Sequence, residues 1–336
     1  MEIKNFDPTL RVISKINYYI NYLNLNLKGY KVLTEVGSDL YNYIPIIPIL
    51  AGAEKVMVWT RDSIYGKADH LITDCQNKIN NISNYPNVEF FKGKINKIHL
   101  KDADIITNSN FLRPLNKAKL QYLKKEVAIP LMYEKWELRK KDIDISYCLK
   151  NGIRVGGTNE DYEKINVFNH IGPLAIKMVF EAGYEIYENN IVIWSDDNFG
   201  NVIKEAMIGL KPKNLLMTTD IEKVKKEARN IDFIFLADYY EKRSFSNDSF
   251  FQLKELSALN PHFGLVHLYG EVNYVETKRL GICCYPKKNG ISQAMSLTLS
   301  HIGINPFVAL VTAGFKVGQC LLEKDYDNEI VQLFDS

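Results

Sequence analysis

Three ionisable side chains in the second half of the chain could move a proton. His267 lies in the apolar run 264–268, Glu271 follows that run, and Lys287 follows the run 281–285. Histidine and carboxylate side chains serve as general acids or bases, and a lysine does so once burial or a nearby cation lowers its pKa. Open α/β sheets bind ligands beyond the carboxyl ends of their strands, so Lys287, His267 and Glu271 are candidate catalytic residues. A structural, partly buried role for His267 is the alternative.

A second polar segment, residues 194–200, follows the apolar run 191–194 and opens a helical pattern. Backbone N–H groups at a helix N-terminus bind phosphates, and an acid about 20 residues further on commonly binds a ribose. The candidate cofactor-binding residues are Ser195, Asp196, Asn198, Phe199, Gly200 and Asp220. The adjacent carboxylates Asp196 and Asp197 would repel a diphosphate, so a helix cap without a cofactor stays an open alternative.

Two segments of the first half are candidates for substrate binding. Glu134, Trp136 and Arg139 lie in a loop-like segment, where the glutamate could bind a hydroxylated or cationic group and the arginine a carboxylate or phosphate. A solvated loop in which Trp136 covers a core edge is the alternative. Arg61 and Asp62 follow the apolar run 55–59, loosely like the nucleoside-binding turns of methyltransferases.

Strand-like and helix-like segments alternate throughout and would position these residues. This alternation predicts an α/β protein with two Rossmann-like domains, each a doubly wound parallel sheet, joined by a bridging helix. We expect an N-terminal domain over 1–160, the bridging helix over 161–184, a nucleotide-binding domain over 185–290 and C-terminal helices over 291–336 that pack across the junction. The predicted strands are 31–35, 55–59, 88–91, 105–107, 128–132, 153–155, 191–194, 214–217, 232–237, 264–268 and 281–285; helical patterns cover 10–27, 162–182, 199–210, 250–259 and two stretches within 291–322.

Composition limits the classes of function. The 336 residues are 46% hydrophobic and 24% charged with a net charge of only +2, which is typical of a globular protein and argues against nucleic acid as a partner. No apolar stretch reaches the ~20 residues that span a bilayer, and the five cysteines include no C-x-x-C pair, so neither a membrane nor structural zinc is expected. We expect a cytoplasmic protein that binds a small molecule, with a homodimer as the default assembly.

One patch resembles a known family. Residues 102–107, 123–125, 139–144 and 148–155 are similar to the end of the first domain of D-2-hydroxyacid dehydrogenases, such as the formate and glycerate dehydrogenases. The resemblance implies a substrate loop at residues 133–139, NAD or NADP on the second domain, and a Gly-x-Gly-x-x-Gly turn, of which only Gly200 remains. The family's substrate-binding arginine has no counterpart after residues 264–268, and Lys287 replaces the histidine of its Pro-His pair.

These observations give one leading hypothesis and two alternatives. The leading hypothesis is a dehydrogenase-like enzyme that acts on a small polar substrate in a cleft between the domains, with a nicotinamide nucleotide as cofactor. The first alternative is a non-catalytic binding or assembly protein on the same scaffold. The second is a group-transfer enzyme with a nucleoside cofactor in the first domain.

Overall fold

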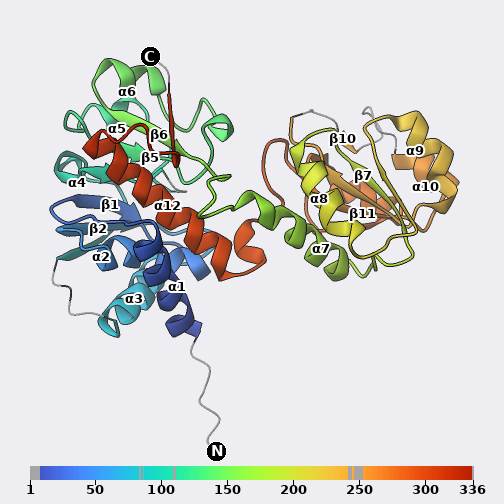
Figure 1. Ribbon diagram of the computed structural model, residues 1–336, viewed down its shortest axis with the longest axis horizontal. Helices are drawn as coiled ribbons and strands as arrows, with labels where there is room; N and C mark the ends of the chain where they lie inside the picture. Colours follow the sequence, from blue (N-terminus) through green and yellow to red (C-terminus); the bar gives the residue numbers. More distant parts are fainter. Residues whose placement is uncertain are drawn as a thin grey trace, which may run out of the picture. The chain divides into compact units, whose positions relative to one another are not determined.

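A computed structural model describes residues 8–82, 85, 87–108, 111–240, 244–245 and 253–334. The chain forms two compact units (Figure 1). Unit 1 consists of residues 1–167 and 304–336, and unit 2 of residues 168–303. Each unit contains its own mainly parallel sheet with helices around it, so the predicted α/β class with two Rossmann-like domains is confirmed.

The sheet of unit 1 has the strand order β14-β6-β5-β4-β1-β2-β3. Its first six strands in the chain are parallel, and their order, 3-2-1-4-5-6, reverses direction between β1 and β4. Strand β14 joins the other edge in the antiparallel sense, with Val331 opposite Thr158. The strands are β1 (Lys31–Glu35), β2 (Lys55–Thr60), β3 (Val88–Lys92), β4 (Ile105–Ile106), β5 (Ala128–Pro130), β6 (Arg154–Thr158) and β14 (Val331–Leu333).

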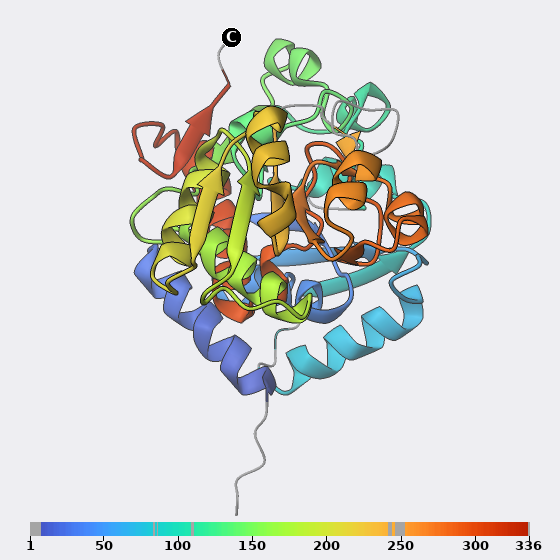
Figure 2. The ribbon, with the colours of Figure 1, turned by 90° about the vertical axis from the view of Figure 1, so that its right-hand side faces the viewer.

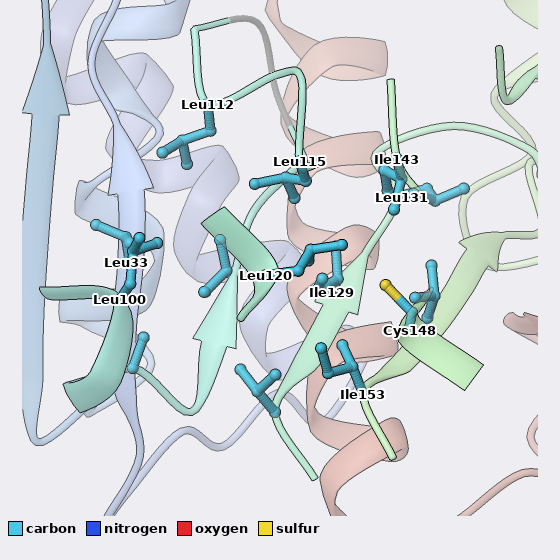
Figure 3. Close-up of a cluster of buried hydrophobic side chains, with 14 of the residues drawn as sticks. Leu33, Leu100, Leu112, Leu115, Leu120, Ile129, Leu131, Ile143, Cys148 and Ile153 are labelled. Carbon is cyan, nitrogen blue, oxygen red and sulfur yellow. The ribbon is translucent and has the colours of Figure 1, made fainter. Parts of the chain in front are cut away.

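Side chains alternate between the two faces of the sheet along each strand, and both faces are covered. Ile106 and Ile129 point into a buried apolar cluster that Figure 3 shows. Ile105 and Pro130 pack against α12, where Gly318 allows the helix to approach the sheet closely. Figure 1 shows α12 in red beside the blue α1. The helices of unit 1 are α1 (Pro8–Tyr22), α2 (Ile46–Leu50), α3 (Ala68–Asn80), α4 (Lys97–Asp102), α5 (Lys117–Leu120), α6 (Ile145–Lys150) and α12 (Ile304–Glu323), with short 3-10 helices η1 (Asp39–Tyr43) and η2 (Lys135–Glu137).

Unit 2 contains a five-stranded parallel sheet of order β13-β11-β9-β7-β8. Its strands β7 (green) and β8 (yellow) lie side by side in Figure 2. The central strands are apolar and buried, as expected for a sheet covered on both faces. Its strands are β7 (Asn190–Trp194), β8 (Asn214–Met217), β9 (Phe233–Ala237), β11 (Gly264–Tyr269) and β13 (Cys283–Tyr285), beside the short pair β10 (Ser244–Phe245) and β12 (Glu271–Val272). Its helices are α7 (Ile171–Glu181), α8 (Asn198–Ile208), α9 (Ile221–Glu227), α10 (Leu253–Leu259) and α11 (Tyr274–Arg279), with 3-10 helices η3 (Phe168–His170), η4 (Ala228–Asn230) and η5 (Leu299–His301).

The bridging helix is shorter than the sequence pattern predicts. Residues 159–167 form hydrogen-bonded turns, and Asn166 adopts a positive φ of 42°, which ends any helix that begins before it. The α-helix therefore begins at Ile171, with Pro173 in its first turn, where proline needs no N–H partner. The helix prediction is wrong over residues 162–167, and residues 168–170 form the 3-10 helix η3.

The region after residue 290 also differs from the prediction of two helical stretches. Residues 291–303 contain only the 3-10 turn η5, because Gln293 and Gly303 both adopt positive φ. The single helix α12 begins at Ile304 and packs on α1, β5 and β6 of unit 1. Strand β14, which follows it, was not predicted.

Helix α12 is also the one helix among the described residues that is long and apolar enough to cross a membrane. In the structure, 78% of its most apolar window is buried inside the protein. A core helix of a water-soluble protein meets the same criteria of length and composition, and the packing of α12 against the sheet accounts for its apolar surface.

Candidate functional site

The turn between β7 and α8 holds the predicted cofactor-binding residues, and Asp197 dominates it. One Asp197 oxygen, Oδ1, accepts hydrogen bonds from the backbone N–H groups of Phe199 (2.9 Å) and Gly200 (3.3 Å) and from the Ser195 hydroxyl (2.9 Å). The other oxygen accepts from the N–H of Tyr239 at 3.4 Å. These two helix N–H groups are the ones that a dinucleotide's phosphates would use. The Asp197 carboxylate thus accepts the hydrogen bonds that a phosphate would otherwise accept.

The same turn keeps the close packing of a dinucleotide-binding turn. A Cβ atom at Gly200 would lie only 2.6 Å from Cβ and Oγ of Ser195 and 2.7 Å from the terminal methyl group of Met217. Ser195 is buried, so this neighbour leaves no room for a side chain at Gly200. The third glycine of the family's motif has this packing role between helix and strand. At Gly200 the turn therefore has the close packing of a dinucleotide-binding turn, and at Asp197 it carries a negative charge.

Aromatic side chains cover the N-terminal end of α8. The Phe199 ring lies 5.5 Å from that of Tyr239 and 4.5 Å from that of Tyr269. All three residues are buried, and Tyr239 follows the end of β9 while Tyr269 ends β11. The carboxyl edge of the sheet in unit 2 thus carries aromatic rings beside the Asp197 carboxylate.

The remaining predicted cofactor residues are exposed. Asp196 accepts a hydrogen bond from the Thr219 hydroxyl at 3.1 Å, and Asn198 is the first residue of α8. Asp220 caps α9 by accepting from the N–H of Glu222 at 2.9 Å. Its second oxygen lies 4.0 Å from the ammonium nitrogen of Lys223.

His267 is buried and fully hydrogen-bonded. Its Nε2 lies 3.0 Å from the carbonyl oxygen of Pro286, which can only accept, so Nε2 carries the proton. Its Nδ1 then accepts from the Ser296 hydroxyl, 2.6 Å away. Burial, aided by the charge of Lys288, lowers the pKa of His267 to about 4. Both nitrogens therefore hold the loop after β13 in place, which is the structural role.

The other two candidate catalytic residues lie elsewhere on unit 2. Lys287 is exposed in the loop after β13. Glu271 begins β12 and is half-buried. The two hydrogen-bond partners of His267 are Pro286 and Ser296, so its ring nitrogens are bonded to neither Lys287 nor Glu271.

The predicted substrate loop of unit 1 is anchored at Glu134. This buried residue accepts hydrogen bonds from the Glu160 N–H (2.8 Å) and from the Gln332 amide (2.6 Å). Its own N–H donates to Glu137 at 3.3 Å. Burial, and then the nearby Glu134 carboxylate, raise the pKa of Glu137 to about 7. The hydrogen bonds of Glu134 are thus made within the protein, whereas Trp136 is 42% exposed.

A second group in unit 1 surrounds Tyr133, next to the exposed Arg139. The Arg139 Nε lies 2.8 Å from Asp142, and the Arg113 guanidinium lies 3.3 Å from the same carboxylate and 5.3 Å over the Tyr133 ring. Asn108, fully buried after β4, donates to the Tyr133 hydroxyl at 2.5 Å. Its Oδ1, like Arg113 Nε, is buried with no hydrogen-bond partner among the described residues. Asn108 and Arg113 were not among the predicted site residues, although Asn108 directly follows a predicted strand.

Arg61 and Asp62 begin the loop after β2, and they do not act together. Asp62 accepts from the N–H of Ala68 at 2.9 Å and pairs with Lys67, so it caps α3. Arg61 lies 5.4 Å over the Phe111 ring. The buried Glu35 at the end of β1 accepts from the N–H groups of Phe111 and Leu112, and it was not predicted either.

Comparisons with known proteins concern the fold. No protein-family model matches the sequence, and the sequence of no curated protein matches it either. The structure is similar to that of a dipicolinate synthase chain from Bacillus halodurans, with a TM-score of 0.52 and 13% identity over 89% of this chain and 98% of that one. It is also similar to the pyruvate reductase of Chlamydomonas reinhardtii, with a TM-score of 0.52 and 10% identity over 90% of this chain and 98% of that one.

The corresponding dipicolinate synthase chain from Bacillus subtilis gives a TM-score of 0.51 at 12% identity, over 90% of this chain and 98% of that one. Each match covers about nine tenths of this chain and therefore includes parts of both units. The similarity to D-2-hydroxyacid dehydrogenase-like proteins inferred from residues 102–155 is therefore confirmed at the level of the fold. The chain has a two-domain Rossmann fold like that of these proteins.

Proposed function

We propose that this protein is a dehydrogenase-like enzyme that acts on a small polar substrate and holds a nicotinamide nucleotide at the turn between β7 and α8. The observation that carries the proposal is the packing of Gly200 against Ser195 and Met217, which brings α8 as close to β7 as a dinucleotide-binding turn requires. In this proposal Asp220, the N-cap of α9, would bind a ribose hydroxyl.

Asp197 sets the strength of binding in this proposal. Its carboxylate already holds the N–H groups of Phe199 and Gly200, so a diphosphate must displace it and also meets its negative charge. The turn thus fits a dinucleotide in shape but opposes it in charge. We therefore expect weak binding of NADH and NADPH by the natural sequence.

The test is to measure nucleotide affinity in an Asp197→Gly variant. Glycine replaces an aspartate cap at a cost of only a few tenths of a kcal/mol, so the fold is retained while the helix N–H groups are released. We expect the variant to bind NADH or NADPH at least about tenfold more tightly than the natural sequence, which corresponds to roughly 1.4 kcal/mol. Isothermal titration calorimetry gives both affinities directly.

The matched control is Asp144→Gly, since Asp144 caps α6 in unit 1 through the N–H of Tyr147. This change should leave nucleotide affinity unaltered. If neither the natural sequence nor Asp197→Gly binds NADH or NADPH, the nicotinamide proposal is refuted. Because one protein of the same fold is a pyruvate reductase, reduction of small oxo acids by NADH or NADPH is the first activity to assay.

A second candidate function rests on the contents of the same site. Asp197 and the rings of Phe199, Tyr239 and Tyr269 already fill the hydrogen-bonding and stacking roles at the end of α8. This arrangement favours a non-catalytic binding or assembly protein that keeps a dehydrogenase scaffold. An assay for the reduction of small oxo acids by NADH or NADPH distinguishes the two, because only the first candidate predicts turnover.

A further inference from the structure

Strand β14 extends the edge of the sheet in unit 1. Its central residue, Gln332, also forms hydrogen bonds with the segment predicted as the substrate loop. The Gln332 side chain accepts a hydrogen bond from the Lys135 N–H at 2.8 Å and donates to Glu134 at 2.6 Å. These two contacts tie residues separated by almost 200 positions. The loop at residues 133–139 is thus fastened by a side chain from the far end of the chain.

The approach between the loop and the sheet depends on a glycine. A Cβ atom at Gly157, which pairs with Gln332 in the sheet, would lie 2.6 Å from the Lys135 backbone nitrogen and 3.1 Å from the Gln332 side-chain oxygen. Next to β14, Phe334 packs against the apolar core cluster, and the Lys135 ammonium group lies 5.5 Å from its ring. Residues 331–334, which we call the strap, are therefore held to the loop by the side-chain hydrogen bonds of Gln332 and by the contact between Phe334 and Lys135.

A group of carboxyl side chains lies under this fastening. Glu134 contacts the strap through Gln332, the N–H of Glu160 through one oxygen, and Glu137 through its own N–H. Burial raises the pKa of Glu160 well above its usual range, and the charges of Glu137, Glu134 and Asp161 act in the same direction. Burial likewise raises the pKa of Glu137 to about 7. Arg113, the cation that faces Glu137, acts in the opposite direction.

We propose that the strap and the Glu134, Glu137 and Glu160 cluster form a switch that fixes the loop at residues 133–139 below neutral pH and releases it in alkaline solution. The sign follows from the direction of the shifts. A carboxyl group that is easier to protonate in the fastened state favours that state at low pH, and this preference is lost as the pH rises through its pKa. Above that pH, the charges of Glu137 and Glu160 add to that of Glu134, and like charges that act on one another repel.

The switch has a consequence for activity only if the proposed function is correct, since the loop is the candidate substrate loop. Its structural part can be tested without substrate or nucleotide. Hydrogen–deuterium exchange of a peptide covering residues 133–139 measures how often the loop opens. Exchange in the helix α7, measured in the same samples, corrects for the pH dependence of the exchange chemistry.

We expect the corrected exchange rate of this peptide in the natural sequence to rise at least about threefold between roughly pH 6 and pH 8.5. A Glu137→Gln, Glu160→Gln double variant, which keeps the shape and removes the titration, should show the slow rate at both pH values. A Gln332→Glu variant places a further negative charge beside Glu134 and should exchange fast at both. Gln121→Leu, a change on the surface after α5, is the control and should behave as the natural sequence.

Each contrary result overturns a defined part of the proposal. If the loop exchanges as slowly in Gln332→Glu as in the natural sequence at about pH 6, the strap does not hold the loop in place. If the double variant keeps the natural pH dependence, the carboxyl cluster is not the switch. The absence of nucleotide binding in the Asp197→Gly experiment would leave both of these results unchanged, so the two proposals fail separately.

Discussion

Replacing His267 by glutamine should make the protein less sensitive to acid. The pKa of about 4 in the folded protein lies below the value of 6.5 expected for an unfolded chain, because burial disfavours the charged imidazole. As the pH falls below 6.5, the unfolded state binds a proton that the folded state refuses, so the free energy of unfolding decreases. The difference between these two pKa values sets a ceiling of about 3 kcal/mol, reached near pH 4, of which about 2 kcal/mol is lost by pH 5. Glutamine can still donate to the Pro286 carbonyl and accept from Ser296 but does not titrate.

The measurement is urea unfolding of the natural sequence and of His267→Gln at about pH 8 and about pH 5. The variant begins with lower stability because the longer amide fits the site less well, so only the change between the two pH values is compared. The natural sequence should lose about 2 kcal/mol more than the variant over this range. The control His262→Gln alters an exposed loop histidine and should follow the natural sequence. Equal losses in His267→Gln and in the natural sequence would refute the assignment of His267 as a buried neutral histidine.

Two further predictions follow from packing and exposure. Gly157→Ala should lower the free energy of unfolding by about 1–3 kcal/mol, because the added methyl group meets the Lys135 backbone at 2.6 Å. The control Gly209→Ala should be close to neutral, because its methyl group has no neighbour closer than 4.0 Å. Urea unfolding measures both changes. Cys283 is exposed while the other four cysteines are buried, so a thiol reagent should modify one cysteine rapidly in the native protein and five after unfolding, as counted by mass spectrometry.

The order of strands and helices could be read from the sequence because most strands are continuous apolar runs. Runs such as 191–194 and 232–237 match buried strands of the structure closely, since buried parallel strands are mainly apolar. The helix predicted from residue 162 failed because apolar periodicity does not reveal the positive φ of Asn166. Strand β14 has only three residues, none of them fully buried, and such a segment carries no periodic signal.

The candidate sites were harder to predict than the fold. Sequence position identified Asp197 as a residue of the phosphate turn, and the structure adds which N–H groups its carboxylate holds. The position of His267 near a strand end suggested chemistry, but its partners, Pro286 and Ser296, lie 19 and 29 residues away in the chain. The contact between Gln332 and Glu134 spans 198 positions and has no local signature. Hydrogen bonds between distant segments are set by the tertiary fold.

The division of unit 1 into two stretches of chain has a consequence for how the protein is made. Helix α12 and strand β14 complete the first sheet, yet they are translated only after all of residues 168–303. While a ribosome synthesises unit 2, the faces of β5 and β6 that α12 will cover, and the free edge of β6, have no partner. The first domain to leave the ribosome is therefore the last one to finish folding, and the nascent chain has to remain soluble with part of its apolar interior open to water.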